Sequence, residues 1–394
     1  MLRKLLFFAA AQAALALSAQ QPFPGDSSRS LLYGDPYLQH VTPTEASVMF
    51  QSTCNVQSWV EYGTDTLQLD YARQLVGGQE AVHDAEHRVR LTGLQPGATY
   101  YYRVGVREIT QNKAYHKEFG REETTPFHRF TLPADTTTHF TALVFNDMHS
   151  VKAVEQAMGS LADRIPHDFV VFNGDCLPEP ADRAEALAAI HSLVRTFHGA
   201  DVPCVFVRGN HEIRNAYSSG MLSLFDYGPG ATTYHAFSWG DTRFVISDCG
   251  EDKPDNTRVY YGLNDFSEFR REQAVFLARE ASGRAFRKAR RRVLIHHIPL
   301  WYSKEKKDAS SVSGACRALW SPALSKMAFD ISVNAHTHEF EMYEKGQYGN
   351  FYPMIIGGGP SPDTATVTVI EKRGKVFRVK VLNVKGEVLW ERMM

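Results

Sequence analysis

The sequence predicts two folded parts, an all-β sandwich followed by an α/β domain. Between residues 31 and 134, short strand-like runs are separated by turn residues and no helical periodicity intervenes. From residue 137 onward, continuous apolar runs alternate with segments of helical spacing, which is typical of a βαβ sheet with helices on its faces. The length of 394 residues agrees with two or three domains.

The first 19 residues have the pattern of a cleaved secretory signal peptide. Arg3 and Lys4 precede a largely apolar stretch over residues 5–17, which ends among small residues. This stretch is shorter than the roughly 20 apolar residues that span a bilayer. We therefore expect a secreted or periplasmic protein without a membrane anchor, in which residues 20–30 form a linker.

The first domain is expected to be a fibronectin type III-like β-sandwich over residues 31–134. Its strand-like runs lie at residues 47–51, 58–62, 87–91, 99–106 and 128–132. The segment Leu94-Gln95-Pro96-Gly97 followed by Thr99-Tyr100 resembles a turn and strand of fibronectin type III domains. There a tyrosine hydroxyl ties the corner to the backbone, and the matching residue is Tyr100.

The second domain is expected to extend over residues 137–394. Apolar runs and helical segments alternate at residues 140–146, 151–164, 168–173, 181–198 and 202–207. A later helix, 265–288, ends in the basic segment 284–292, which we interpret as a solvated helix terminus rather than a nucleic-acid site. Alternation over residues 365–390 predicts closing strands.

The composition indicates no general attraction to nucleic acid or to an anionic lipid surface, so an anionic substrate must be captured locally. Lys and Arg total 43 against 44 Asp and Glu, so no global positive field attracts a nucleic-acid polymer. The five cysteines are widely spaced and form no metal-binding knuckle, although one or two disulfides are compatible with an oxidising compartment. The 16 histidines are the unusual feature.

Five polar clusters follow apolar runs along the second domain. They are Asp147-Met148-His149, Gly174-Asp175, Gly209-Asn210-His211-Glu212, His296-His297-Ile298-Pro299 and His336-Thr337-His338. The carboxyl ends of strands in an open α/β sheet converge on one crevice, so we expect these clusters to meet. Carboxylate, amide and imidazole ligands suit Zn, Mn or Fe, and a central Asp175 is able to bridge two ions about 3.5–4 Å apart.

The order of these clusters resembles that of the calcineurin-like metallophosphoesterase superfamily, whose fold is a two-sheet sandwich flanked by helices. The β-domain ahead of it resembles the architecture of purple acid phosphatases. The resemblance implies two metal ions, Fe, Mn or Zn. One ion would be held by Asp147, His149, Asp175 and His338. The other would be held by Asp175, Asn210, His297 and His336, with His296 as the alternative to His297.

The chain departs from the purple acid phosphatase pattern at two motifs. That pattern continues Gly-Asp-x-x-Tyr, with the tyrosine on ferric iron, but Pro178 stands at the tyrosine's position. We therefore expect no charge-transfer colour, with His149 supplying the ligand instead. Ala335 replaces the usual glycine before His336, a change that we expect to be tolerated.

The activity implied is hydrolysis of small phosphate esters by a metal-activated hydroxide. In this account His211 protonates the leaving oxygen or stabilises the phosphoryl group, and Glu212 supports it. Arg208 either grips phosphate or is a surface arginine. Trp301 and Tyr302 either form an aromatic wall for the substrate or serve packing.

We expect a phosphomonoesterase similar to acid phosphatases. The alternative within the family is a phosphodiesterase acting on nucleotides or glycerophosphodiesters. The alternative of another class is a secreted binding protein with a non-catalytic metal domain, although the retention of every metal-ligand type argues against it. The oligomeric state is left open.

Overall fold

The computed structural model describes residues 29–303 and 311–394. The predicted signal peptide and all but the last two residues of the predicted linker lie outside the described residues. None of the described helices combines the length and the apolar character needed to cross a bilayer.

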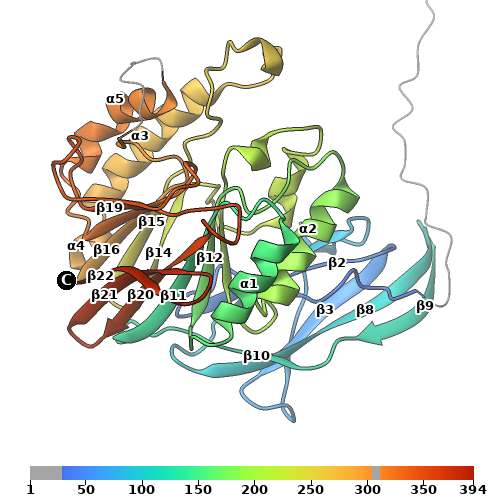
Figure 1. The fold of residues 1–394 in the computed structure, drawn as a ribbon. Coiled ribbons are helices and arrows are strands. Elements are labelled where there is room, and N and C mark those ends of the chain that lie inside the picture. Colours follow the sequence, from blue (N-terminus) through green and yellow to red (C-terminus); the bar gives the residue numbers. More distant parts are fainter. Residues whose placement is uncertain (1–28, 304–310) are drawn as a thin grey trace, which may run out of the picture.

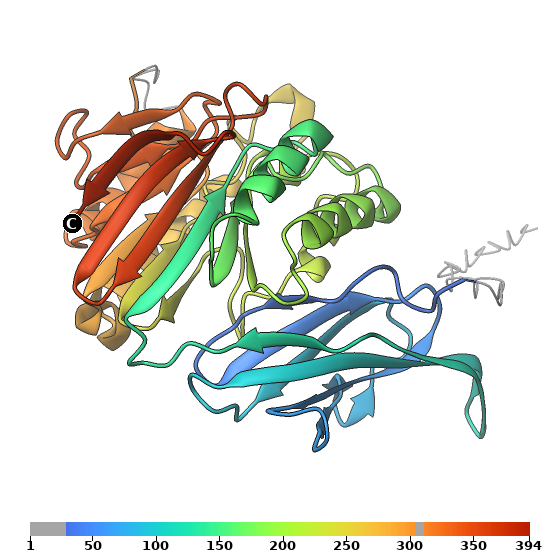
Figure 2. The ribbon, with the colours of Figure 1, turned by 60° about the horizontal axis from the view of Figure 1, so that its bottom comes forward.

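The N-terminal domain consists of antiparallel strands in two main sheets (Figure 2). The smaller sheet contains β1 (Tyr37–Gln39), β2 (Glu45–Gln51) and β7 (Glu86–Thr92). The larger has the order β10 (His128–Thr131), β8 (Thr99–Lys113), β3 (Val56–Gly63) and β4 (Asp70–Ala72), and β9 (His116–Thr124) also pairs with β8. A small hairpin joins β5 (Leu75–Val76) to β6 (Gln79–Glu80).

The corner before β8 contains the tyrosine contact expected from the sequence. The backbone N–H of Gln95 donates a hydrogen bond of 3.1 Å to the hydroxyl of Tyr100. The ring of Tyr100 stacks on Phe130 of β10, with centroids 6.1 Å apart, so the same side chain joins the corner to the core.

The second domain contains two six-stranded sheets packed face to face (Figure 1). The first sheet has the order β13 (Cys204–Val207), β12 (Phe169–Asn173), β11 (His139–Phe145), β20 (Thr366–Arg373), β21 (Val376–Asn383) and β22 (Val388–Met393). The second has the order β14 (His235–Trp239), β15 (Thr242–Ile246), β16 (Arg291–Ile295), β17 (Ile331–Asn334), β19 (Met354–Ile356) and β18 (Glu341–Tyr343). This architecture confirms the fold class expected from the sequence.

Parallel strands place the polar clusters predicted from the sequence at one end of the sheets. Strands β11, β12 and β13 are mutually parallel, and so are β15, β16, β17 and β19. Between the sheets, residues such as Val144 and Ile295 are fully buried in one apolar core. Because these strands are covered on both faces, they are continuous apolar runs in the sequence.

Helices cover the outer faces of both sheets. The first sheet packs against α1 (Lys152–Ala162) and α2 (Arg183–Thr196), and the second packs against α3 (Phe266–Ser282), α4 (Arg284–Lys288) and α5 (Val312–Leu324). The predicted helix 265–288 is divided at Gly283, whose ψ of 145° is extended. Three short 3₁₀ helices complete the domain: η1 (His211–Ile213), η2 (Gly220–Leu224) and η3 (Arg258–Tyr260).

The two domains are joined by hydrogen bonds from buried tyrosines. The Tyr37 hydroxyl donates to the carbonyl of Leu224 at 2.7 Å, and the Tyr102 hydroxyl donates to that of Ala200 at 2.6 Å. Nε2 of His191 on α2 lies 2.8 Å from the side-chain oxygen of Gln51.

The five cysteines are all free. The disulfides left open by the sequence are therefore not formed in this structure. Four of the five thiols are buried, including Cys204, for which burial raises the pKa to about 12.

Candidate metal centre

All five polar clusters lie in loops at the carboxyl ends of parallel strands. Three loops follow β11, β12 and β13 of the first sheet, and two follow β16 and β17 of the second. The first two loops are tied by backbone hydrogen bonds, from the N–H of Asp147 to the carbonyl of Gly174 at 3.1 Å and from that of His149 to Asp175 at 2.8 Å. The sheet edges thus bring together residues separated by almost 200 positions.

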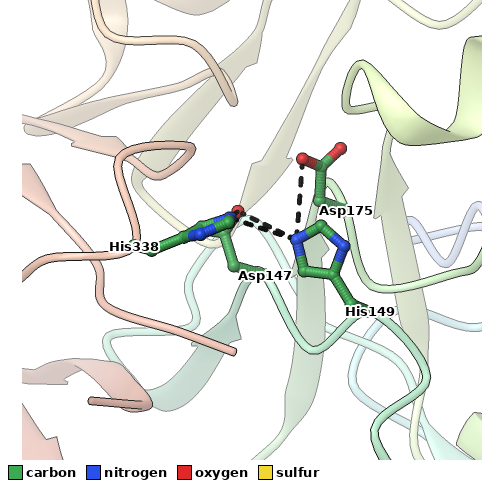
Figure 3. A group of neighbouring side chains, drawn as sticks. All are labelled: Asp147, His149, Asp175 and His338. Carbon is green, nitrogen blue, oxygen red and sulfur yellow. Dashed lines mark hydrogen bonds and ion pairs between the residues drawn. The ribbon is translucent and has the colours of Figure 1, made fainter. Parts of the chain in front are cut away.

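The first group with the geometry of a metal site comprises Asp147, His149, Asp175 and His338, whose candidate ligand atoms all lie within 4.8 Å of one another (Figure 3). Nε2 of His338 is 3.4 Å from Oδ1 of Asp147. Nε2 of His149 is 3.9 Å from a carboxylate oxygen of each aspartate. The two Nε2 atoms are 3.1 Å apart. Figure 3 shows the four side chains turned toward a common point.

The second group comprises Asp175, His297 and His336, so Asp175 belongs to both. Oδ2 of Asp175 is 3.0 Å from Nε2 of His297. Asn210 joins this group because its side-chain oxygen lies 2.9 Å from Nδ1 of His336. A shared carboxylate between two ligand sets is the arrangement of two-metal hydrolytic sites.

His297 faces the centre, whereas the neighbouring His296 points into the core. The Nδ1 atom of His297 is 2.9 Å from the carbonyl oxygen of Asn173, which leaves Nε2 free to face the aspartates. His296 is fully buried against Asn334 and the carbonyl of Ile298, 2.8 Å from its Nδ1. Of the two histidines left open by the sequence, the geometry therefore selects His297 as the candidate ligand.

The backbone of five of the seven candidate ligands is strained. Asp147, His149, Asp175, His336 and His338 have positive φ values, between 47° and 76°. Each such conformation costs of order 1–3 kcal/mol in a non-glycine residue and persists where the surroundings enforce it. Gly209 allows the close approach of the loops, since a Cβ atom there would lie 2.3 Å from Oδ1 of Asp175.

The buried donor atoms fit a cation. Oδ1 of Asp147 and Nε2 of His297 are buried and make no well-aligned hydrogen bond among the described residues. Their nearest charged neighbours are Nε2 of His338 at 3.4 Å and Oδ2 of Asp175 at 3.0 Å, respectively. Oδ2 of Asp147 is satisfied, accepting from the side-chain amide of Asn146 at 2.7 Å and the backbone N–H of His336 at 2.9 Å. Buried polar atoms without a partner are costly, and bound cations would satisfy both of these, Asp147 in the first ligand group and His297 in the second. The residues present therefore fit the implied metals.

The pKa shifts of the centre also favour a bound cation. Burial lowers the pKa of His297, but Asp175 and Asp147 outweigh it and raise that pKa to about 10. Burial would raise the pKa of Asp175, whereas His297 and His211 hold it well below its usual range. The carboxylates of Asp147 and Asp175 thus favour positive charge between the buried side chains. A metal cation would compete with the proton on His297 for this position. Burial lowers the pKa of His336 to about 4, which keeps its ring neutral and able to ligate.

Glu212 supports the loops rather than facing the substrate. Its carboxylate accepts hydrogen bonds from the backbone N–H groups of Asp175, Leu177 and Gly209, at 2.9, 3.0 and 2.8 Å. The side chain is almost fully buried. Glu212 is therefore a positioning residue that joins the loop after β12 to the loop after β13.

His211 lies at the edge of the centre, with two charged neighbours that sequence reasoning missed. Its backbone N–H donates to Oδ1 of Asp175 at 2.8 Å, and its Nδ1 is 3.0 Å from the carboxylate of Glu179. Nη1 of Arg214 is 3.2 Å from its Nε2. Glu179 and Arg214 follow the recognised motifs by only a few residues, but their relation to His211 depends on the loop paths and has no sequence signal.

The remaining predicted substrate residues are engaged by other side chains. Arg208 donates from Nε to Asp248 at 2.8 Å, and its guanidinium lies over the ring of Phe269. Trp301 is buried and packs edge-on against Phe351, with ring centroids 5.3 Å apart. Tyr302 is partly buried against the same core. Packing therefore accounts for Trp301, and an ion pair accounts for Arg208.

Comparison with known proteins agrees with this fold. Residues 140–340 match the family model described as calcineurin-like phosphoesterase, and residues 35–119 match the model described as purple acid phosphatase, N-terminal domain. The fold and the site define a metal-dependent phosphoester hydrolase. Because the first match covers half of the sequence, the chain belongs to the calcineurin-like phosphoesterase family.

Two solved structures share this fold across both domains. The purple acid phosphatase PPD1 from yellow lupin (Lupinus luteus) seeds superposes with a TM-score of 0.62 at 16% identity, covering 91% of this chain and 73% of its own. PhoD superposes with a TM-score of 0.60 at 13% identity, covering 91% and 88%. A search of curated proteins found no match.

Proposed function

We propose that the protein is a secreted phosphomonoesterase that uses two metal ions, with Fe, Mn or Zn as candidates, on small phosphate esters. The observation that carries the proposal is the shared carboxylate of Asp175 between two ligand groups, beside the buried atoms of Asp147 and His297 that make no well-aligned hydrogen bond among the described residues. The Arg3-Lys4 and apolar N-terminal pattern supports secretion.

In this proposal one ion is held by Asp147, His149, Asp175 and His338, and the other by Asp175, Asn210, His297 and His336. Bound metal ions act as Lewis acids that neutralise phosphoryl oxygens and make water a nucleophile near neutral pH. The chain's own contribution is to fix these ligands with strained loops and a buried glutamate, so that little reorganisation accompanies the reaction.

His211 is placed to act on the leaving oxygen. Glu179 faces Nδ1 of His211 and thereby orients the ring, while Nε2 faces the centre, 3.9 Å from Oδ2 of Asp175. The side chain is 28% exposed, so a substrate can reach it. In this arrangement Nε2 of His211 accepts from Nη1 of Arg214. His211 would take up or deliver a proton at Nε2 once that contact opens, and Arg214 would stabilise negative charge nearby.

The test is hydrolysis of p-nitrophenyl phosphate against its bis ester, after chelation and restoration of Mn, Zn or Fe. The proposal expects the monoester to be cleaved with the higher kcat/KM and cleavage to depend on the restored metal. Preference for the bis ester would assign a phosphodiesterase instead. Cleavage of neither ester by the folded, metal-loaded protein would favour a binding protein.

Secretion is tested separately, by expressing the full chain and identifying the N-terminus of the mature protein. Removal of about the first 19 residues is the expected result.

A further inference from the structure

A large groove adjoins the candidate centre on the side of His211. One side of the groove is the segment that contains η1 and η2. The other side is the loop that leads to α3, seen as the yellow loop that projects at the top of Figure 1. Its volume is about 790 Å³, within the range of small-molecule sites. Half of its lining is apolar and includes Ile213, Leu222, Val259, Tyr261 and Leu263, after which we call it the apolar groove. The other half, which includes Arg214, is polar or charged.

The apolar groove begins one side chain away from the proposed proton donor. Arg214 lines the groove and at the same time contacts Nε2 of His211 at 3.2 Å. This inference rests on the proposed function, in which His211 acts on the leaving oxygen. A group bonded to that oxygen would extend past His211 and Arg214 into the groove.

The cations that line the groove are each paired. Arg214 donates to Glu251 at 2.9 Å and to Asp252 at 3.0 Å, and it also contacts Glu179. Lys253 is 2.5 Å from Asp252, and Arg208 is paired with Asp248. The cluster of Arg214 and Lys253 with three carboxylates carries no excess positive charge. A leaving group with its own phosphate or carboxylate would therefore gain little there.

The outer wall of the groove exposes large apolar side chains. Val259 is 67% exposed, Tyr261 79% and Leu263 89%. Tyr261 also has a positive φ of 48°, an uncommon conformation for an aromatic residue. Neighbouring apolar side chains exposed in this way mark a surface that binds something.

We propose that the apolar groove binds the leaving group of the substrate, and that this group is an uncharged apolar alcohol. Three features of the groove support this occupant: it begins beside His211, its cations are already paired, and its outer wall is apolar. Val259, Tyr261 and Leu263 are then specificity-determining residues, which cover the alkyl or aryl part of the ester.

The test measures kcat/KM on n-alkyl monophosphates from ethyl to hexyl, whose leaving alcohols have nearly the same pKa. Complete burial of one methylene corresponds to about a four-fold gain, and we expect about two-fold per methylene in a groove open to solvent. Binding of the matching n-alkylphosphonates, measured by calorimetry on the same metal-loaded protein, is expected to follow the same trend. Phosphoglycolate, which replaces the methyl group of ethyl phosphate with a carboxylate, is expected to be a poorer substrate than ethyl phosphate.

The matched variants are the double substitution V259S/L263S in the groove and L67S in the N-terminal domain. Leu67 is 92% exposed, so it matches Leu263 in chemistry and accessibility. The groove variant is expected to lose most of the hexyl-to-ethyl ratio in kcat/KM and in phosphonate binding. L67S is expected to keep both ratios.

A flat chain-length series in the unmodified protein, or an equal loss of the ratio in L67S, would overturn the inference. Loss of self-association or of binding to phosphatidylcholine vesicles in V259S/L263S, with the ratio unchanged, would also overturn it by assigning these side chains to a partner. Hydrolysis of no ester at all would instead overturn the proposed function, and the phosphonate binding series would still decide the role of the groove.

Discussion

Two buried regions of this molecule contain histidines, and their surroundings differ. At the candidate centre, His297 faces two carboxylates that raise its pKa to about 10, and its Nε2 atom lies 3.0 Å from Oδ2 of Asp175. At the domain interface, His191 faces the neutral side chain of Gln51, and burial lowers its pKa to about 4. Burial of a histidine alone therefore does not indicate a metal site, whereas burial beside unsatisfied carboxylate oxygens does.

The largest expected effect comes from removing the shared carboxylate. Asp175→Asn keeps the size of the side chain but removes the charge common to both ligand groups. We expect kcat/KM to fall by more than about 100-fold, because changes to mere supporting partners of metal ligands already cost about 10–100-fold. Metal content per chain, measured by mass spectrometry, should fall with it.

Asp163→Asn is the control for this substitution. Asp163 is an exposed aspartate that contacts His198 at 2.9 Å, away from the centre. An Asp175→Asn protein with unchanged metal content and activity would remove Asp175 from the proposed site.

A smaller effect is expected from Glu179→Gln. The substitution weakens the contact that orients His211, and we expect kcat to fall about ten-fold with metal content unchanged. The control is Glu118→Gln, since Glu118 contacts His116 at a similar distance, 2.8 Å, on an exposed strand. A loss of metal in Glu179→Gln, or equal kcat values in the two variants, would contradict the positioning role.

The last expected effect concerns stability rather than activity, at the domain interface. The pKa of His191 is about 4 in the folded protein against 6.5 ordinarily, so the unfolded chain binds more protons between these values. Stability is therefore full above about pH 6.5 and is lost as pH falls toward 4. Lowering the pH from 7 to 5 should therefore reduce the free energy of unfolding by up to about 2 kcal/mol through this histidine.

His191→Gln should remove that part of the acid destabilisation, as measured by urea denaturation at both pH values. His116→Gln, at an exposed histidine, should leave the pH dependence as it is. An identical acid loss in both variants would show that His191 is not neutral in the folded protein.

The sequence predicts the parts of the fold whose burial produces a pattern. The apolar run 140–146 corresponds to β11 and the run 168–173 to β12, because both strands are covered on two faces. By contrast, β9 was not predicted, since eight of its nine residues are exposed and no alternation marks it. The division of the predicted helix 265–288 at Gly283 depends on backbone conformation at one residue.

The candidate site likewise has a part that the sequence predicted and a part that it did not. Its candidate ligand residues were predicted because each follows a strand in a recognisable order, and the resemblance to calcineurin-like phosphoesterases is confirmed by the family match. Glu179, Arg214 and the apolar groove were not predicted, because loop paths decide which side chains meet. Trp301 suggested an aromatic wall by its position in the sequence, but its ring packs in the core.

The position of Asp175 between two metal ions can be tested by anomalous diffraction from crystals of the metal-loaded protein, recorded at the absorption edge of the restored metal. We expect two peaks per chain, about 3.5–4 Å apart, one beside His149 and His338 and the other beside His297 and His336. A single peak, or two peaks that do not share Asp175, would show that this carboxylate does not join two ions.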